Sequence, residues 1–425
     1  MSQSYWDKLL QRRLSRRRAL TATGGAAVGA ALLAACGGDE EEKEPTAAPP
    51  AEIKIGAVIP LTGRYAAGGA LIKGGYEIAQ DDINAAGGVE VKQFKKKIPI
   101  KINILDDASD PTQTVSRLEQ HYAAGVLAYL GGFASDLHAA AAAIAEKNKT
   151  PYLGVAFALY SVHQKGYKYL FSPFPKSPGL TKAWFDLMDA QSPKPLKLAL
   201  FVEKTDWGTE MRELWRKEAA ARGYQVVADE EYASPGSTDL SPMILKAKNA
   251  GAESVLSIPS PPDGTLLLKQ MKELDFNPKI AFFVRAADSP TWGTNLGKDG
   301  DYVALSPGWN NDLKFEGITQ FNTKYQTKYN TPALSVSGPA YVATQILADA
   351  ISRAEKLDRD SIRDAITKTD MKSSLIGPVK FNPDGTGVVQ IVVAQWQNQK
   401  MVSVWPKDIA AGTLLYPATP FKERA

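Results

Sequence analysis

Short apolar segments alternate with longer amphipathic segments along most of the chain, beginning at Ile53. A short apolar run predicts a buried strand, and a longer segment that is apolar on one face predicts a helix covering the sheet. The first series has predicted strands at 53–59, 98–105, 126–130 and 151–155, and helices at 70–84, 112–124 and 135–147. The second series has predicted strands at 196–202, 226–228, 254–257 and 280–283, and helices at 182–190, 210–221, 240–250 and 266–274. We therefore expect an α/β fold with two Rossmann-like lobes, each built on its own sheet.

The order of elements changes after residue 304. Helices are predicted at 316–329, 336–355 and 361–368, followed by strands at 379–381, 388–395 and 401–405. This tail predicts that the chain returns to complete both lobes, with crossings near Pro173, Ser306 and Gly377. The predicted first lobe comprises 53–172 plus 306–378, and the second comprises 173–305 plus 379–425. Several crossings together form a hinge about which two lobes open and close.

The first 52 residues follow another pattern. Residues 1–18 are cationic and residues 19–35 are apolar, which is the order of an export signal and is short for a membrane-spanning helix of about 20 residues. The segment Ser15-Arg16-Arg17-Arg18-Ala19-Leu20 resembles the twin-arginine export motif, and Leu33-Ala34-Ala35-Cys36 resembles a bacterial lipobox. We expect residues 1–35 to be removed, Cys36 to be lipidated, and residues 36–52 to form a flexible tether.

The net positive charge of the chain comes from its first 35 residues. The formal net charge is +4, but six of the 50 basic residues and one of the 46 acidic residues lie in the first 35 positions. The remainder has 44 basic and 45 acidic residues. The basic character therefore belongs to the leader, and the body shows no composition typical of nucleic-acid binding.

Sequence signatures of catalysis and metal binding do not occur. The chain has no G-x-S-x-G, Walker or H-E-x-x-H motif, and His121, His138 and His163 lack metal-ligand spacing. The pair Asp106 and Asp107 follows a predicted strand, where structural hydrogen bonding competes with acid chemistry or metal binding as its role. We expect no enzyme activity, no catalytic residue, no metal and no cofactor.

A series of short segments in a fixed order carries a family resemblance. Residues 55–63 read Ile-Gly-Ala-Val-Ile-Pro-Leu-Thr-Gly, residues 82–89 read Asp-Ile-Asn-Ala-Ala-Gly-Gly-Val, and residues 377–381 read Gly-Pro-Val-Lys-Phe. Their order and spacing, from about residue 53 to about residue 396, resemble the leucine/isoleucine/valine-binding protein family of ABC-transporter receptors. The resemblance implies a type I periplasmic-binding fold, with the solute between the lobes at the carboxyl ends of strands. Helix N-termini and loop amides at such ends can donate to a carboxylate.

The resemblance also implies which first-lobe residues bind the solute. Phe133, Ala134 and Ser135 occupy the loop that holds the ligand carboxylate, and Ser135 would also cap the helix that follows. Ala156 and Ala158 lie in a second ligand loop, with Ala158 where the family usually has a hydroxyl group.

The implied second-lobe residues are Trp207, as an aromatic side chain that closes over the ligand, Ser260 and Arg285. Ser260 lies among prolines, which would stiffen its loop and make that wall more apolar. Amino-acid-binding members place a carboxylate near the position of Arg285 to pair with the ligand ammonium. Arginine there favours a carboxylate instead, and Asp288 would supply the acid if the alignment shifts by three residues.

The sequence therefore predicts an exported lipoprotein, anchored at the outer face of the cytoplasmic membrane, that passes a small carboxylate-bearing solute to an ABC permease. Branched-chain amino acids are the family default, and Arg285 with Ala158 leaves an aliphatic or aromatic carboxylic acid as an alternative. A ligand-sensing receptor lipoprotein of the same fold is the alternative function. We expect a monomer that binds no nucleic acid.

Overall fold

The computed structural model describes residues 48–234 and 236–424. The chain from Pro49 on forms one compact unit. The predicted export signal, the lipobox with Cys36 and nearly all of the predicted tether lie outside the described residues. Within the described ranges, no helix has the length and apolar character needed to cross a membrane.

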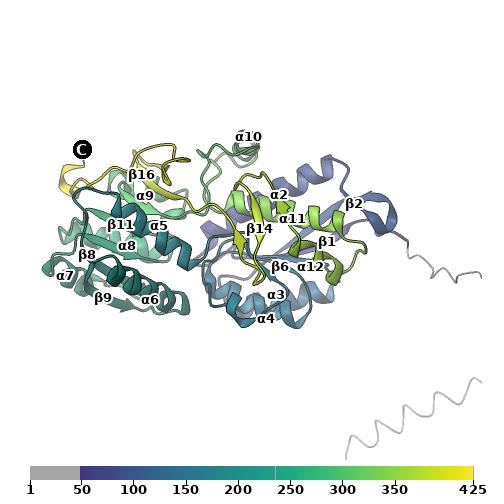
Figure 1. Cartoon of the computed structure of the whole chain (residues 1–425), viewed down its shortest axis with the longest axis horizontal. Helices are drawn as coiled ribbons and strands as arrows, with labels where there is room; N and C mark the ends of the chain where they lie inside the picture. The colour runs from purple at the N-terminus through teal and green to yellow at the C-terminus, as the bar shows by residue number, and fades with distance from the viewer. Residues whose placement is uncertain (1–47, 235, 425) are drawn as a thin grey trace, which may run out of the picture. The chain divides into compact units, whose positions relative to one another are not determined.

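The first sheet is parallel throughout. Its strand order is β4 (Ile100–Asp106), β1 (Ile53–Ile59), β5 (Ala128–Leu130), β6 (Tyr152–Leu153) and β7 (Leu170–Phe171). Its helices are α2 (Ala66–Ala85), α3 (Pro111–Ala123), α4 (Ser135–Lys147), α10 (Ile318–Tyr329), α11 (Ser337–Arg353) and α12 (Arg359–Thr367). Figure 1 shows α3 and α4 on one side of this sheet and α2 with α11 on the other. The strand order reverses between β1 and β5, where α/β sheets commonly bind ligands.

The second sheet has seven strands. Their order is β17 (Lys400–Trp405), β16 (Val393–Gln397), β12 (Val303–Leu305), β11 (Ile280–Phe283), β10 (Ser254–Ser257), β8 (Lys197–Glu203) and β9 (Gln225–Tyr232), and only the β12–β16 and β16–β17 pairings are antiparallel. Its helices are α5 (Ser177–Asp189), α6 (Asp206–Ala221), α7 (Ser241–Asn249), α8 (Pro261–Glu273) and α9 (Trp292–Leu296). The prediction of an α/β fold with two Rossmann-like lobes is confirmed.

Two helices begin five residues earlier than predicted, and proline explains both differences. Helix α5 begins at Ser177, with Pro178 in its first turn, and α8 begins at Pro261, followed by Pro262. Proline is tolerated in a first turn because the N–H it lacks there has no intrahelical acceptor. Pro261 and Pro262 therefore start a helix, and the prediction that they stiffen a ligand loop is wrong for these two residues; Pro259 does lie in the loop before the helix.

Two small sheets complete the part of the chain that the structure describes. The hairpin of β2 (Val89–Val91) and β3 (Lys96–Ile98) was not predicted, and Pro99 separates β3 from β4. Strands β13 (Asp370–Met371), β14 (Val379–Phe381) and β15 (Gly387–Val388) form an antiparallel sheet.

The predicted division assigned residues 379–388 to the second lobe, but their contacts are with the first. Val379 lies in the apolar core of the first sheet, and the ring of Phe381 lies 5.4 Å from that of Phe171. Ser172 pairs with Thr386 beside β7. We therefore propose that the third crossing follows Val388 rather than Gly377.

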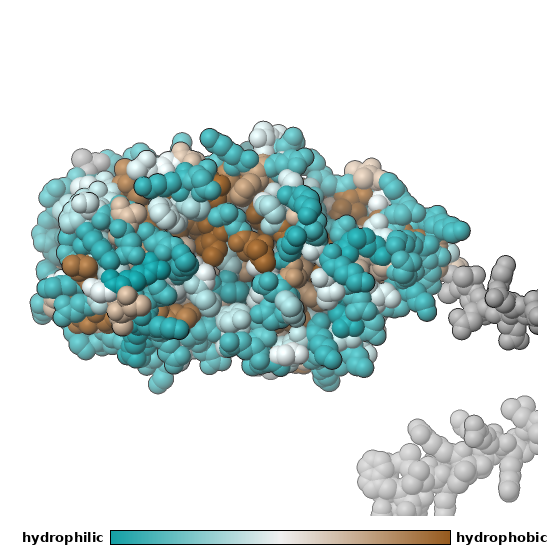
Figure 2. Space-filling model, in the orientation of Figure 1, coloured by the Kyte–Doolittle hydropathy of each residue, from teal (hydrophilic) through white to brown (hydrophobic). Residues whose placement is uncertain are grey.

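One hydrophobic side chain of this crossing, Ile391, lies against α5. Gly179 in α5 leaves room for Ile391, whose Cδ1 would be 2.5 Å from a Cβ at position 179. Figure 2 shows a largely hydrophilic surface with hydrophobic residues gathered near the middle, over the region of α5 and β14 in Figure 1. Ile391 therefore contacts the second lobe, while Val389 and Val392 pack with the apolar core of the first.

Apolar contacts also continue from one lobe to the other. One buried cluster contains Val58 and Tyr129 of the first sheet, Ala158 and Leu159 of a connecting loop, and Leu200 of the second sheet. The lobes are therefore closed on one another in this structure, with hydrophobic side chains excluded from water across their boundary.

The close packing of α2 on α11 gives a test of the first lobe. A Cβ on Gly75 would lie 2.4 Å from the carbonyl oxygen of Ser337 and 2.8 Å from Cβ of Ala340. We expect Gly75→Ala to lower the free energy of unfolding by roughly 1–3 kcal/mol in urea denaturation, because the backbone of α11 must move. Ala70→Leu, on the exposed side of α2, is the control and should leave the unfolding free energy nearly unchanged. Equal stability of both variants would contradict the close packing.

Candidate ligand-binding site

The two predicted first-lobe loops lie side by side at the carboxyl end of the first sheet. Phe133 and Ala156 form a β-bridge, and the Ala134 N–H donates to the Ala156 carbonyl at 3.0 Å. The two loops follow β5 and β6, which are neighbours in the sheet. Backbone pairing therefore holds both loops in one fixed arrangement.

Ala134 has a backbone conformation that alanine rarely adopts. Its φ is 78° and its ψ is 144°, close to a region that is essentially restricted to glycine. Ala134 is the N-cap of α4, and the described part of the chain supplies no side-chain cap there. The prediction that Ser135 caps α4 is therefore wrong, because Ser135 is the first helical residue. Its hydroxyl oxygen instead accepts from the Leu159 N–H at 3.4 Å.

A buried histidine holds the strained residue. His138 Nδ1 lies 2.7 Å from the Ala134 carbonyl oxygen and donates to it, and the imidazole stacks on Phe157 with ring centroids 4.5 Å apart. Burial lowers the pKa of His138 to about 3, so the ring is neutral near pH 7. His138 therefore connects both loops without adding charge to the site.

Trp207 lies in the first turn of α6, where Thr205 caps the helix by accepting from the Gly208 N–H at 3.0 Å. Its indole N–H donates to Ser177 Oγ at 3.1 Å, and its side chain is buried. This hydrogen bond fixes the indole at the boundary between the lobes.

Arg285 follows β11 in a strained turn. Its φ is 71° and its ψ is −49°, and the Ala286 N–H donates to the Val284 carbonyl at 2.9 Å. This geometry corresponds to the rare form of γ-turn, which costs a non-glycine residue of order 1–3 kcal/mol. Such strain persists only where the surrounding contacts determine the conformation.

The guanidinium of Arg285 makes its polar contacts with other groups of the protein. Arg285 forms an ion pair with Glu203, which is fully buried at the end of β8. Arg285 Nη2 also donates to the Ile258 carbonyl at 2.8 Å. The guanidinium carbon lies 5.4 Å from the centre of the Tyr65 ring and 5.3 Å from that of Trp207. Burial alone would lower the pKa of Arg285, but Glu203 raises it, so the residue stays charged.

Ser260 lies behind this ion pair. Its backbone N–H donates to Glu203 Oε1 at 2.6 Å, and its hydroxyl donates to Asp263 at 2.7 Å. The N–H and hydroxyl groups of Ser260 therefore donate to the acidic residues near Arg285 and do not point to a solute in the cavity.

The other seven predicted residues line one cavity between the lobes. They are Phe133, Ala134, Ser135, Ala156, Ala158, Trp207 and Arg285. The cavity has a volume of about 30 Å³, close to the space of a single water molecule. A second compartment of about 250 Å³ shares Ser135, Trp207 and Arg285 with it and is also lined by Tyr65. Trp207 and Arg285 thus lie at the partition between the two compartments.

Asp288 is the acidic residue of the inner cavity. It is 6% exposed, and Oδ1 has no hydrogen-bond partner among the described residues. Burial raises the pKa of Asp288 to about 7, against the lowering effects of Ser335 and Arg285. Its carboxyl group can therefore gain or lose a proton near neutral pH.

The sequence reasoning missed several residues that line these compartments. Tyr65 follows β1 closely, so its position after a strand end could have indicated it. Phe157, Phe174, Val284, Ser306 and Val336 also line the inner cavity. Ser306 and Val336 come from the tail of the chain, where local patterns give no sign of a place in the site.

Asp106 and Asp107 make structural hydrogen bonds. Asp106 accepts from the Leu61 N–H at 2.8 Å and from the Thr62 hydroxyl at 2.7 Å, while Asp107 accepts from the Ser109 N–H at 3.0 Å. These bonds fasten the segments that follow β1 and β4. Among the residues that the structure describes, no group of His, Cys, Asp and Glu is arranged to hold a metal ion.

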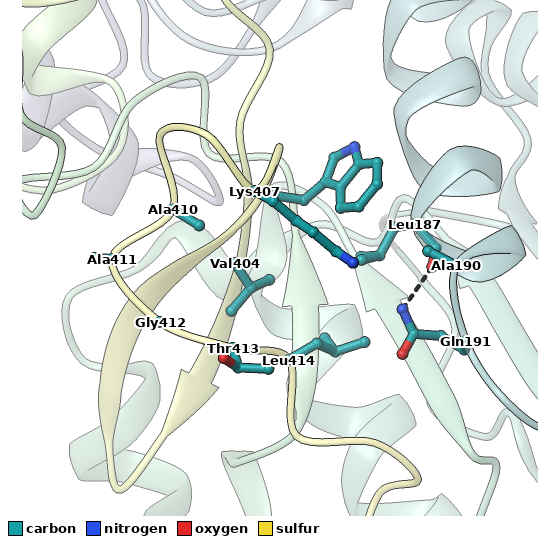
Figure 3. Close-up of a pocket in the computed structure, with 11 residues that line it drawn as sticks. Leu187, Ala190, Gln191, Val404, Lys407, Ala410, Ala411, Gly412, Thr413 and Leu414 are labelled. Atoms are coloured by element: carbon teal, nitrogen blue, oxygen red, sulfur yellow. Dashed lines mark hydrogen bonds between the residues drawn. The ribbon is translucent and has the colours of Figure 1, made fainter.

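A separate hollow of about 520 Å³ lies between the end of α5 and the segment after β17. Figure 3 shows the Lys407 side chain extending across it toward the end of α5, and the Gln191 amide donating to the Leu187 carbonyl. The eight predicted binding residues lie elsewhere. Strained backbone, a buried ion pair and contributions from both lobes instead favour the interlobe cavity as the candidate site.

Comparisons with known proteins agree with this architecture. A family model described as periplasmic binding protein matches residues 52–400. Leu/Ile/Val-binding protein homolog 8 of Brucella abortus (strain 2308) is 25% identical over 386 residues, which cover 86% of this chain and 93% of that protein. Leu/Ile/Val-binding protein homolog 7 of the same organism is 26% identical over 390 residues, which cover 86% and 94%.

Solved structures show the same fold. The leucine-binding protein LivK from Thermotoga maritima aligns with a TM-score of 0.76 and 22% identity, covering 84% of this chain and 100% of that one. The branched-chain amino acid transporter substrate-binding protein LivJ from Streptococcus pneumoniae, in complex with isoleucine, aligns with a TM-score of 0.73 and 20% identity, covering 82% and 97%. The chain belongs to the periplasmic binding protein family.

Proposed function

We propose that the protein is an exported, lipid-anchored receptor that binds an amino acid with an apolar side chain between its lobes and delivers it to an ABC permease. The observation that carries this proposal is the interlobe cavity, where residues of both lobes meet at the carboxyl ends of the two sheets. The relatives named for leucine, isoleucine and valine support the same class of solute.

The first lobe offers a place for the carboxylate of the solute. Ser135 is the first residue of α4, a helix of 13 residues, and its side chain borders both compartments. The first N–H groups of a helix have no intrahelical acceptor and carry the positive end of its dipole. A carboxylate beside Ser135 would accept from these N–H groups.

The second lobe decides between an amino acid and a simple carboxylic acid. The charge of Arg285 is offset by Glu203, so the guanidinium brings little net positive charge to the cavity. Asp288 has a carboxylate oxygen free to accept from an ammonium group. A zwitterion therefore complements the cavity better than a net anion does, which favours an amino acid over the carboxylic acid suggested by Arg285 in the sequence.

The remaining walls favour an apolar side chain. Phe133, Phe157, Phe174, Val284 and Val336 line the inner cavity. Their hydrocarbon and aromatic surfaces are complementary to an aliphatic or aromatic group and offer no hydrogen bond to a polar one.

Entry of the solute requires the lobes to separate. Small-molecule sites commonly enclose about 300–1,000 Å³, whereas the inner cavity has about 30 Å³. Motion about the crossings would merge the two compartments by moving Trp207 and Arg285 away from Ser135. A solute that contacts both lobes then favours their closure around it.

Matched pairs of solutes test the class of ligand. Leucine and 4-methylpentanoate differ only in the α-amino group, as do phenylalanine and 3-phenylpropanoate. In calorimetry with residues 49–425, we expect an amino acid to bind at least tenfold more tightly than its partner, because Asp288 pairs only with the ammonium. Asp288→Asn should reduce this preference, and tighter binding of the acids would contradict the proposed zwitterion.

The affinity should also depend on pH. Asp288 must be deprotonated to pair with an ammonium, and its pKa is about 7 before binding. We therefore expect the affinity for leucine to rise by up to tenfold per unit as the pH increases toward 7, and to level off near pH 8. Burial also raises the pKa of Asp107, to about 6, but Asp107 is present in both the parent and the Asp288→Asn variant. Any effect of Asp107 on the affinity is therefore the same in the two proteins. A pH dependence that persists unchanged in Asp288→Asn would assign the effect to another group.

The lipid anchor is tested at Cys36. Because the fatty acids would be carried by a diacylglyceryl group in thioether linkage to its sulfur, Cys36→Ala expressed in a bacterial host should fail to incorporate a labelled fatty acid. The parent chain and the control Thr46→Ala should both be labelled. Labelling of Cys36→Ala equal to that of the parent would rule out lipidation at this sulfur.

A further inference from the structure

A carboxylate of the second lobe binds the backbone of a ligand loop in the first. Glu210 lies in α6, one turn after Trp207. One of its carboxylate oxygens accepts from the Tyr160 N–H at 2.8 Å, and the other accepts from the Ser161 N–H at 2.8 Å. Two hydrogen bonds to an ionised acceptor are stronger than neutral ones and define the orientation of both partners.

The bound loop is the one that lines the cavity. Ala156, Phe157 and Ala158 line the inner cavity, and the next three backbone N–H groups all donate hydrogen bonds. The Leu159 N–H donates to Ser135, and those of Tyr160 and Ser161 donate to Glu210. The end of the loop is thus fixed by one residue from each lobe.

Glu210 also acts on a buried lysine at the first crossing. Lys176 Nζ donates to the Phe157 carbonyl at 2.7 Å and to Ser172 Oγ at 2.7 Å. Burial lowers the pKa of Lys176, while the charges of Glu210 and Asp384 act in the opposite direction. The carboxylate of Glu210 therefore favours the charged form of a residue that joins the ligand loop to the hinge.

We propose that Glu210 is a positioning residue that fixes the 154–161 loop from the opposite lobe when the lobes close. It lies outside the sets of described residues that line the two compartments, so it acts through the loop rather than on the solute. Its two hydrogen bonds break when α6 moves away from the first lobe, because the amides and the carboxylate then meet water. They therefore contribute to the equilibrium between open and closed lobes, and through it to affinity.

The helix itself supplies a matched control. Glu213 is one turn further along α6 and is exposed. In Glu210→Ala, we expect hydrogen exchange of the Tyr160 and Ser161 amides to be at least tenfold faster than in the parent, and the affinity for leucine to be about tenfold weaker. Glu210→Gln should show an intermediate effect, because one amide oxygen can accept in place of two carboxylate oxygens. Glu213→Ala should match the parent in both measurements.

Only the affinity measurement rests on the proposed function; amide exchange is measured without a solute. If no amino acid binds the parent, the proposed function fails while faster exchange at Tyr160 and Ser161 still supports the role of Glu210. Unchanged exchange in Glu210→Ala would overturn that role. Exchange that becomes faster equally throughout α6 would overturn it too, because the residue would then stabilise the helix alone.

Discussion

The guanidinium of Arg285 is buried between the ends of the two sheets, so its hydrogen-bond and ion-pair partners must come from the protein itself. The arrangement of residues in the cleft depends on this requirement. Arg285 follows β11, Glu203 ends β8, and the carbonyl of Ile258 follows β10, so one side chain connects the ends of three neighbouring strands. An unpaired charge in this place would cost several kcal/mol, which exceeds the strain of the γ-turn at Arg285. The ion pair therefore determines the backbone that positions Asp288 in the cavity.

The first lobe solves a comparable problem with neutral groups. Ala134 is held in its strained conformation by the Ala156 carbonyl on one side and by His138 on the other. These hydrogen bonds make the loop beside the N-terminus of α4 rigid. Because burial keeps His138 uncharged, the positive end of the α4 dipole remains available to an anion. One wall of the site is thus organised by a compensated charge and the other by hydrogen bonds between neutral groups.

Closure and binding share the same residues. Trp207 and Arg285 form the partition between the two compartments, and Glu210 holds the ligand loop from one turn further along α6. The apolar cluster that spans both lobes stabilises the closed arrangement through contacts that do not depend on orientation. The polar contacts, in contrast, form only when both lobes are in particular positions. The combination of apolar and polar contacts therefore favours a small number of defined lobe positions over a continuous range of them.

The sequence by itself predicted most of the strands and helices, the two-lobed α/β fold and the loops that border the cleft, because hydrophobic periodicity and strand ends are local properties. It could not decide the role of Arg285, since the partner that neutralises it, Glu203, comes from another strand, and only the order of strands in the sheet brings them together. The same holds for Ser135, whose helical position follows from the backbone of Ala134, and for Ser260, which lies behind the ion pair. Charge compensation, hydrogen bonding and enclosure depend on which strand ends and loops meet, and that is a property of the tertiary structure alone.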